Sequence, residues 1–293
     1  MIISSTNLTK SYKKNSVLNG VDLAIEEGKI YGLLGRNGTG KSTLLAIIAG
    51  QIRHNDGDIT VFGRKPFDSA KVMDQVVLAG IDTPYSEWWS ISKILEVAAQ
   101  RFPHWDAKAA DFLIKEFGLD ITTRYGKASR GQRSMVGIIV ALAANAPLTL
   151  IDEPYLGLDV HNRAIFYREL LKSQERNPRT FVMATHDLGE SAKVIDRYLL
   201  LGKQGTIDAT LDADAVDEAF VQVDGTDLPH AIVDKAHHLE EMGGRTKAVL
   251  RRVDLAQALD ELPGNARVSN LPLEEALGLL LGGGDNGAET PSR

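Results

Sequence analysis

A glycine-rich segment at residues 35–42 constrains the fold of this chain more than any other feature. It reads GRNGTGKS, follows the apolar run 30–34 and precedes a run of helix-forming residues at 43–49. Glycines let the backbone turn tightly and point several N–H groups into one concavity, to which the start of the following helix adds its positive end. Such a concavity binds phosphate groups. The sequence therefore predicts a strand, an anion-binding loop and a helix in succession.

Two side chains of this segment have expected roles of their own. Lys41 can reach the β- and γ-phosphates of a nucleotide as a point charge, and the hydroxyl of Ser42 is placed to bind Mg²⁺. A glycine-rich turn that binds nothing is the alternative, and the flanking strand and helix argue against it. The predicted phosphate-binding residues are those of the loop and the first turn of the helix: Gly35, Arg36, Asn37, Gly38, Thr39, Gly40, Lys41, Ser42 and Thr43.

The composition describes a globular protein with two unlike parts. The chain has 293 residues, of which 43% are hydrophobic, and no cysteine. It can therefore bury sizeable cores, and it has no disulfide scaffold, thiolate catalysis or cysteine-ligated zinc. From residue 206 onward, 17 Asp and Glu stand against 7 Lys and Arg, a charge of −10, whereas the preceding residues, with 22 and 26, carry +4. Neither part has the concentrated basic charge typical of nucleic-acid binding, so we expect no direct contact with nucleic acid.

Neither a membrane span nor an export signal is expected. The longest apolar-leaning run, 136–151, contains Asn145 and Pro147 and falls short of the roughly 18–20 residues that a span needs. The N-terminus lacks the basic start, continuous apolar stretch and cleavage site of a secretory signal, so the expected location is cytoplasmic.

The pattern along residues 1–205 is typical of an α/β domain with a largely parallel sheet, because short β-branched runs alternate with longer apolar-periodic stretches. The predicted strands are 29–34, 58–62, 76–78, 148–151, 180–184 and 198–201. No good strand occurs over about 83–145, which we interpret as an inserted helical subdomain. Its predicted helices are 91–101, 107–118 and 130–145.

The remainder of the chain is predicted to form a small α+β accessory domain over residues 206–281. Strand-like segments lie at 219–223 and 246–253, and helix-like segments lie at 255–262 and 273–281. Residues 282–293 contain no sizeable apolar group to bury, so we expect a disordered tail.

A hydrolysable nucleotide needs a second, acidic group of residues, and Asp152 and Glu153 supply it. The apolar residues 148–151 are predicted as a strand that delivers both to the carboxyl edge of the sheet, where the glycine-rich loop also lies. There Asp152 can hold Mg²⁺ directly or through water, and Glu153 can act as general base or orient the attacking water. A surface Asp-Glu pair is common, and the position after a buried strand favours the functional interpretation.

Taken in order, these motifs resemble those of the ATP-binding subunits of ABC transporters, and the resemblance covers roughly residues 1–205. It implies the P-loop NTPase core of that family, with ATP and Mg²⁺ as the bound groups. Tyr12 matches the aromatic residue that stacks on adenine in this family, with Val17 beside it, and an aromatic face can bind a base in this way. A strand tyrosine packed on the sheet is the alternative for Tyr12.

A degenerate copy of the family's signature segment, Leu-Ser-Gly-Gly-Gln, lies at residues 128–132 as ASRGQ. It keeps Ser129, Gly131 and Gln132 at the start of a predicted helix. The resemblance implies that this hydroxyl and these N–H groups bind the γ-phosphate of a nucleotide held by a second copy. Ser129 is also a suitable N-cap for that helix, which is the structural alternative.

Three further positions follow from the resemblance. Residues 154–159, PYLGLD, resemble the D-loop that runs along the partner subunit. His186 lies just after the predicted strand 180–184 and resembles the switch histidine, where an imidazole can help to fix phosphate and water. The glutamine that the family places after its third strand is missing, and Asp82 is the nearest polar substitute. A carboxylate can ligate Mg²⁺ as an amide does, so Asp82 is a candidate metal ligand.

The resemblance implies ATP-driven closure of two copies around two nucleotides, with hydrolysis assisted by Glu153 releasing the clamp. The work would be delivered to a separately encoded membrane permease, which would hold the chain at the inner face of the membrane. The second ATPase subunit can be identical or different. Residues 271–276, LPLEEA, resemble the terminal segment of an exporter-type branch whose ATPase carries a C-terminal extension.

Other classes remain as alternatives. A soluble ABC-type ATPase acting on DNA, ribosomes or another macromolecule often carries two ATPase units or a long coiled-coil insertion, and neither is visible here. A P-loop kinase or GTPase is disfavoured because the sequence lacks a guanine-reading Asn-Lys-x-Asp segment and has the signature segment before Asp152. A binding-only regulator stays open because the family's glutamine is missing. The pair Trp88 and Trp89 is interpreted either as an exposed docking surface or as core of the helical subdomain.

Overall fold

The computed structural model describes residues 1–185, 189, 191–259 and 262–282. The chain divides into two compact units, Met1–Thr210 and a second unit that begins at Leu211. The division lies beyond the predicted boundary at 205 because β9 (Ile207–Asp212) pairs with β8 (Arg197–Leu201) at the edge of the first unit's sheet. None of the helices among these residues combines the length and the apolar character needed to cross a bilayer.

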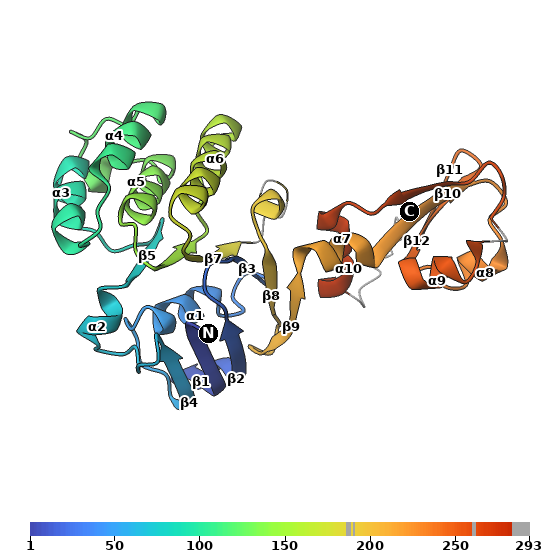
Figure 1. The fold of residues 1–293 in the computed structure, drawn as a ribbon, viewed down its shortest axis with the longest axis horizontal. Coiled ribbons are helices and arrows are strands. Elements are labelled where there is room, and N and C mark those ends of the chain that lie inside the picture. The colour runs from blue at the N-terminus through green and yellow to red at the C-terminus, as the bar shows by residue number, and fades with distance from the viewer. Residues whose placement is uncertain (186–188, 190, 260–261, 283–293) are drawn as a thin grey trace, which may run out of the picture. The chain divides into compact units, whose positions relative to one another are not determined.

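The first unit is built around a six-stranded sheet in the order β5-β6-β7-β3-β8-β9 (Figure 1). Its remaining strands are β5 (Val76–Gly80), β6 (Leu148–Asp152), β7 (Thr180–Thr185) and β3 (Ile30–Leu34). Four neighbouring pairs run parallel, and every residue of β3 and β7 is buried. Strands buried on both faces are nearly continuous apolar runs, which is why the sequence predicted them. The predicted α/β class with a largely parallel sheet is confirmed.

A second sheet of the first unit is antiparallel, in the order β2-β1-β4. Its strands are β1 (Ile3–Tyr12), β2 (Asn15–Ile25) and β4 (Asp56–Val61), and their apolar side chains join those of α1 (Lys41–Ile48) and of the parallel sheet in one core. The sequence did not predict β1 or β2. The register of β1 against β2 shifts between Ser5 and Leu8 and again after Leu8, and such irregularities interrupt the alternation by which strands are recognised.

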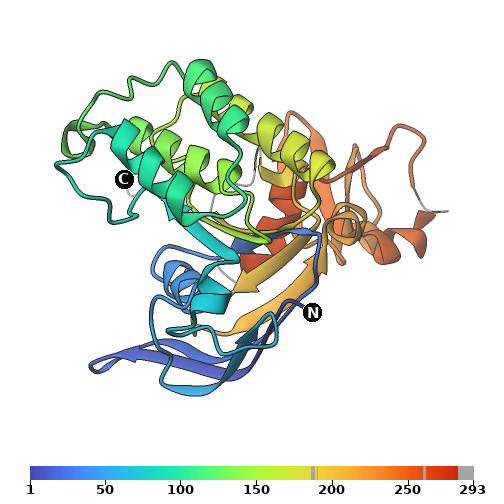
Figure 2. The ribbon, with the colours of Figure 1, turned by 60° about the vertical axis from the view of Figure 1, so that its left-hand side comes forward.

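Helices α3 (Ile91–Arg101), α4 (Ala107–Glu116) and α5 (Arg130–Ala143) lie between β5 and β6 in sequence and gather on the side of the parallel sheet away from β1, β2 and β4 (Figures 1 and 2). All three were predicted, although α4 and α5 end earlier than expected. A short helix, α2 (Ala70–Met73), precedes β5.

The long helix α6 (Val160–Arg176) was not predicted. Charged and polar residues dominate it, and it buries a few apolar side chains: Ile165, Phe166, Tyr167 and Leu170. Its start is marked by Asp159, whose side chain accepts a hydrogen bond from the backbone N–H of Asn162, a signal that the sequence carried.

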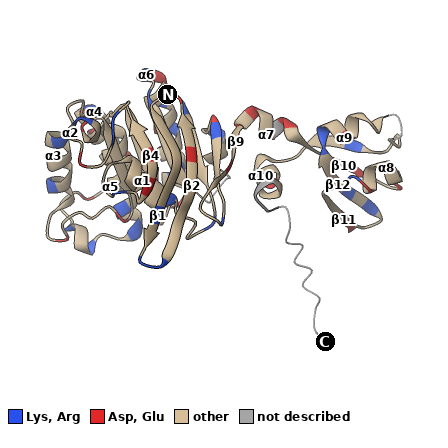
Figure 3. Ribbon diagram, turned by 90° about the horizontal axis from the view of Figure 1, so that it is seen from below, with Lys and Arg blue, Asp and Glu red and all other residues tan. Residues whose placement is uncertain are grey.

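The second unit contains a four-stranded antiparallel sheet in the order β11-β12-β10-β13. Its elements are α7 (Ala213–Ala219), β10 (Phe220–Gly225), α8 (His230–Val233), β11 (His238–Met242), β12 (Arg245–Arg251), α9 (Arg252–Ala256), β13 (Arg267–Asn270) and α10 (Leu273–Gly282). A small core lies between one face of the sheet and the helices α8 and α9: Val221, Val223, Ile232, Ala248, Leu250, Leu255 and Ala258. Basic and acidic positions are mixed along its strands (Figure 3), as where Arg245 pairs with Asp224.

Several expectations for this unit need correction. The edge strands β11 and β13 were missed because all of their residues are exposed and show no buried alternation. The helix expected at 255–262 instead begins at Arg252 and ends at Ala256. Gly282, expected to begin the tail, is the last residue of α10, and residues 283–293 lie outside the described part of the chain.

Candidate active site

The glycine-rich loop joins β3 to α1 in the predicted order. A Cβ on Gly35 would lie 2.5 Å from the carbonyl oxygen of Leu201. Gly40 has φ of +107°, and a Cβ there would lie 2.9 Å from side-chain carbons of both Val17 and Leu18. Only glycine fits these two positions without displacing neighbours. The loop therefore keeps its curvature and leaves the start of α1 open.

Lys41 is the first residue of α1, and its side chain turns back into the loop. Its Nζ donates hydrogen bonds to the carbonyl oxygens of Gly35, at 2.7 Å, and Arg36, at 3.4 Å, and lies 3.6 Å from Oε1 of Glu153. The residue is only 5% exposed. A buried ammonium held among acceptors at a helix N-terminus is suited to anionic oxygens, and phosphate groups supply these.

Asp152 ends β6 at the carboxyl edge of the sheet, where register places it beside Gly80 of β5 and Ala184 of β7. Burial raises the pKa of this carboxyl group above its usual value, and the hydrogen bond from the hydroxyl of Ser42 acts in the opposite direction. Oδ1 of Asp152 is buried and has no hydrogen-bond partner among the described residues. A carboxylate oxygen left in this way, with a serine hydroxyl on the same carboxyl group, fits a hard cation such as Mg²⁺.

Glu153 follows immediately and has left-handed backbone geometry, with φ of 49°. Its N–H donates to the carbonyl oxygen of Ala184 at 3.1 Å. Oε1 faces Lys41, and Oε2 accepts a hydrogen bond from the hydroxyl of Tyr155. Left-handed geometry is uncommon for a residue other than glycine and persists where the surroundings impose it. The carboxylate is thus fixed beside the phosphate loop.

Two cavities meet at Glu153. One, of about 340 Å³, is lined by the loop and by Val17: Val17, Asn37, Gly38, Gly40, Lys41, Ser42, Thr43 and Glu153. The other, of about 240 Å³, includes Ser42, Asp82, Asp152 and Glu153. The negative charge of Asp82 contributes to the raised pKa of Asp152. The structure therefore brings Asp82 to the same site as the acidic pair.

Tyr12 lies outside both cavities. It ends β1 and is 47% exposed, with the ammonium of Lys10 lying 5.0 Å from its ring centroid. The ring is thus not buried against the sheet. His186, the other residue expected near the γ-phosphate, lies outside the described residues.

The signature-like residues form the start of α5 and do not line either cavity. The hydroxyl of Ser129 accepts a hydrogen bond from the N–H of Gln132, and the side chain of Gln132 accepts one from the N–H of Ser129. Ser129 is therefore an N-cap within a capping box, as the structural alternative predicted. A Cβ on Gly131 would lie 2.5 Å from the carbonyl oxygen of Gly157, so the start of α5 packs directly on the turn after Glu153.

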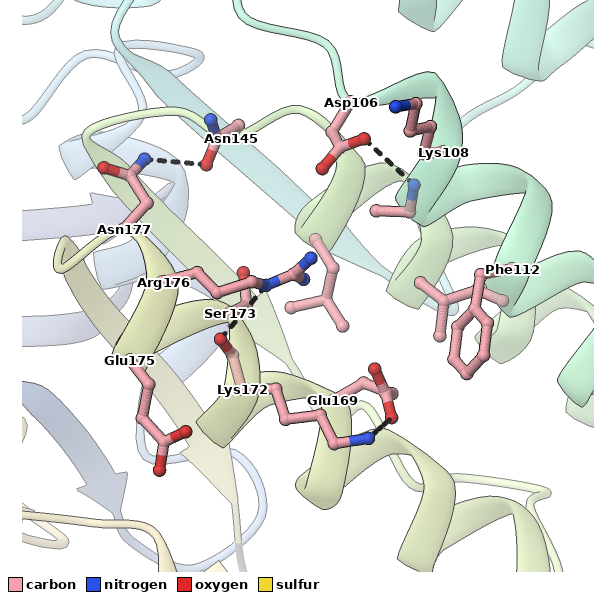
Figure 4. Close-up of a pocket in the computed structure, with 13 residues that line it drawn as sticks. Asp106, Lys108, Phe112, Asn145, Glu169, Lys172, Ser173, Glu175, Arg176 and Asn177 are labelled. Atoms are coloured by element: carbon pink, nitrogen blue, oxygen red, sulfur yellow. Dashed lines mark hydrogen bonds and ion pairs between the residues drawn. The ribbon is translucent and has the colours of Figure 1, made fainter.

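A further cavity, of about 500 Å³, lies between α4, the end of α5 and α6 (Figure 4). The elements that line it stand at the amino ends of β6 and β7, opposite the phosphate loop. Two of its acidic side chains are engaged within the chain: Glu169 pairs with Lys172, and Asp106 caps α4. None of the predicted site residues lines this cavity.

Sequence reasoning missed the contact between Tyr155 and Glu153. Tyr155 was noted as part of the D-loop-like segment, and the sequence pattern did not indicate that its hydroxyl turns back to the acidic pair. The contact between Gly131 and Gly157 was also missed, since the two glycines lie far apart in sequence and nothing local predicts the approach of their backbones.

A family model described as ABC transporter matches residues 18–156. The lipopolysaccharide export system ATP-binding protein LptB of Haemophilus influenzae is 33% identical over 221 residues, which cover 71% of this chain and 90% of that protein. This chain belongs to the ABC transporter ATP-binding protein family. As a member of it, the chain is an ATP-binding protein and an ATP hydrolase.

Other relatives of this ABC ATPase agree on the family and differ in what they are named for. The ABC transporter ATP-binding protein YtrB of Bacillus subtilis is 25% identical over 222 residues, which cover 76% of each chain. The zinc uptake system ATP-binding protein ZurA of Listeria innocua is 28% identical, over 71% of this chain and 86% of that protein. A solved ATP-binding subunit of an ABC transporter superposes with a TM-score of 0.64 at 24% identity, over 74% of this chain and 92% of that one, and so shares the fold.

Proposed function

We propose that this ABC ATPase powers a separately encoded membrane permease by closing with a second ATPase subunit around two ATP molecules. One observation carries the proposal for the site itself: Lys41, Ser42, Asp152 and Glu153 converge at one edge of the sheet. In this proposal Lys41 and the loop N–H groups hold the phosphates, and Glu153 accepts a proton from the attacking water or orients it.

The residues that would hold Mg²⁺ are Ser42 and Asp152, with Asp82 as a third candidate. The unpartnered, buried Oδ1 of Asp152 supports this assignment. When bound, the ion would neutralise negative charge on the phosphate oxygens. Asp82 is exposed and lines the same cavity as Asp152, so it can approach a bound ion without first leaving a buried environment.

The second subunit, identical or different, would complete each site with its Ser129, Gly131 and Gln132. In the single chain these residues do not line the two cavities at Glu153. Because they lie outside these cavities, they are available to a nucleotide held by the other subunit. His186 is proposed to contact the γ-phosphate, and Tyr12 with Val17 to receive the adenine. Val17 already lines the cavity of the phosphate loop.

The permease is proposed to dock on the loop that carries Trp88 and Trp89. These side chains are 81% and 40% exposed, which favours a docking surface over a place in the helical core. Their backbone is fixed, because Tyr125 N–H donates to the carbonyl oxygen of Trp89 at 2.8 Å and Gly126 N–H donates to that of Glu87 at 3.0 Å. Two exposed tryptophans on a fixed loop are typical of an interface. The permease would hold the chain at the membrane.

The relatives include both an uptake protein and an export protein, so the exporter-type branch stays a prediction. The assignment of 206–281 as an accessory domain to that branch stays a prediction for the same reason. The permease would choose the cargo and its direction.

The test is to purify the tagged chain from its native membranes in mild detergent and to measure ATP turnover of the wild type and of Glu153→Gln. The proposal predicts an integral membrane protein in the complex, steady turnover by the wild type, and loss of turnover in the variant. The double variant Trp88→Ala/Trp89→Ala should lose the membrane protein and keep its ATP binding. An active complex without an integral membrane protein would instead favour a soluble ATPase acting on nucleic acid or ribosomes, or a regulator.

A further inference from the structure

Tyr155 lies two residues after Glu153, and its side chain points back to the site instead of outward. It is 2% exposed, and its hydroxyl donates a hydrogen bond to Oε2 of Glu153. The turn between them is held by backbone hydrogen bonds from Leu156 N–H to the carbonyl oxygen of Glu153, at 3.3 Å, and from Leu158 N–H to that of Tyr155, at 3.0 Å. A buried tyrosine hydroxyl needs a partner, and here that partner is the proposed general base.

The ring of Tyr155 is held by the first turn of α6. The guanidinium of Arg163 lies 5.4 Å from the ring centroid, and Nε of Arg163 donates to the carbonyl oxygen of Leu158 at 3.2 Å. On the other side of the turn, the hydroxyl of Ser134 on α5 donates to the carbonyl oxygen of Leu156 at 2.5 Å. The turn is thus anchored to two helices, so the tyrosine hydroxyl is presented to Glu153 by fixed structure.

The two oxygens of Glu153 face different partners. Oε1 lies 3.6 Å from Nζ of Lys41, which phosphate groups would engage, and Oε2 faces the hydroxyl of Tyr155. The contact with Tyr155 uses a different oxygen from the one that faces Lys41, so a nucleotide that engages Lys41 does not compete for it. A neutral hydroxyl fixes a carboxylate without neutralising it. A lysine or arginine at this place would instead form an ion pair that offsets the negative charge of the carboxylate.

We propose that Tyr155 is a positioning residue for hydrolysis, whose hydroxyl fixes one oxygen of Glu153 so that the other faces the attacking water. This rests on the proposed role of Glu153 as general base or water positioner. Tyr155 acts through Glu153 and is not expected to contact ATP, so it should govern the rate of hydrolysis and leave nucleotide affinity unchanged.

The test uses Tyr155→Phe in the full-length chain, which removes the hydroxyl and keeps the buried ring. We expect kcat to fall about tenfold, the order of one hydrogen bond to a charged group, while KM and the Kd for ATP with Mg²⁺ stay within about twofold. In the Glu153→Gln background, Tyr155→Phe should change the residual rate by less than about twofold, because the group through which it acts is gone.

The matched control is Tyr31→Phe. Tyr31 is fully buried in the same unit, and its hydroxyl accepts a hydrogen bond from the N–H of Glu26 at 2.9 Å. The Tyr31→Phe variant should be less stable than the wild type and should keep the wild-type kcat. An unchanged kcat in Tyr155→Phe, a raised Kd, or melting below the assay temperature would overturn the inference. If Glu153→Gln itself retains turnover, the role of Glu153 fails first, and the two failures are thereby distinguished.

Discussion

The N-termini of α1 and α5 differ in whether a side chain caps them. Gly40 precedes α1 in a left-handed conformation, and no side chain of a described residue caps that helix. Ser129 precedes α5 and exchanges two hydrogen bonds with Gln132. The first N–H groups of a helix lack partners within the helix and need acceptors from elsewhere. α5 obtains acceptors from its own side chains, whereas α1 presents its N–H groups to the cavity of the phosphate loop.

From this difference we infer separate tasks for the two helix starts. The start of α1 lies beside a buried ammonium and an acidic pair, so we propose that it binds an anion within the same chain. The start of α5 is capped by Ser129 and Gln132 and packs on the turn at Gly157. We propose that it contacts a nucleotide held by a second copy.

The largest effect is expected from Lys41→Ala, which removes the only ammonium that the described residues place between the loop and Glu153. Loss of such a charge should lower kcat/KM for ATP by roughly 100-fold to 1,000-fold. Steady-state ATP hydrolysis measures it. Lys93→Ala is the control, since Lys93 pairs with Glu96 on the surface of α3 and should retain full activity. Near-normal turnover by Lys41→Ala would mean that α1 is not the phosphate-binding helix.

The next largest effect is expected from Gly40→Ala. The added Cβ would meet Val17 and Leu18 at 2.9 Å in a left-handed backbone, so we expect a loss of about 1–3 kcal/mol in the free energy of unfolding, measured by urea denaturation. Gly63→Ala is the matched control, with φ of +69° and open space around the site. The Gly63→Ala variant should lose only the smaller part of the free energy of unfolding, which comes from placing alanine in a left-handed backbone. Equal losses in both variants would show that the close approach at Gly40 is unimportant.

Ser129→Ala tests whether the start of α5 does more than cap its own helix. It should cost about 1 kcal/mol of stability through the lost N-cap. If α5 serves a second copy, its ATPase rate should also fall, and the fall should be greatest at enzyme concentrations that favour dimers. Asp106→Ala removes a comparable cap from α4 and should lose stability with kcat unchanged. Identical behaviour of the two variants would leave Ser129 with a structural role alone.

The smallest effect concerns pH. Burial raises the pKa of Asp152 in the folded, nucleotide-free protein, so the folded state holds this proton more strongly than the unfolded state. The protonated carboxyl group therefore stabilises the fold. This stabilisation is fully present below the pKa of Asp152 in the unfolded state and is lost as pH rises through its pKa in the folded state. Asp152→Asn should therefore raise Tm at neutral pH without nucleotide, and this gain should vanish in acid.

Asp120 provides a control of opposite sign for the pH prediction. Hydrogen bonds, the first from the hydroxyl of Thr122, lower the pKa of Asp120, so its contribution is present above the unfolded pKa and is lost as pH falls through the folded value. Asp120→Asn should lower Tm slightly at neutral pH. Melting curves across pH 3–8 compare both variants with the wild type, and a lower Tm for Asp152→Asn at pH 7 would contradict the account.

The sequence predicted those parts of the fold in which local pattern and burial agree. The strand before residue 35, the strand that delivers Asp152 and the helix starting at Arg130 are apolar runs with clear boundary residues, and the structure confirms these elements. The antiparallel strands β1 and β2 were missed because their register is irregular. The edge strands of the second unit, β11 and β13, were missed because all of their residues are exposed.

The site followed the same rule. The sequence could place the loop and the acidic pair on one edge, because parallel strands end together. It also offered Ser129 as an N-cap of α5, but it could not reveal that the hydroxyl of Tyr155 bonds to Glu153 or that the start of α5 packs on the turn at Gly157. These contacts depend on side-chain rotamers and on how α5 and α6 flank the turn after Glu153, which a linear pattern does not encode.

The most direct test of the central claim is titration calorimetry of ATP into the nucleotide-free Glu153→Gln chain, with and without Mg²⁺. We expect one ATP to bind per chain, with higher affinity when Mg²⁺ is present, and we expect binding to be lost when Lys41→Ala is added. We also expect that Asp152→Asn in the same background abolishes the gain from Mg²⁺. Equal binding by all of these variants would contradict the claim that Lys41, Ser42, Asp152 and Glu153 form a single magnesium–ATP site.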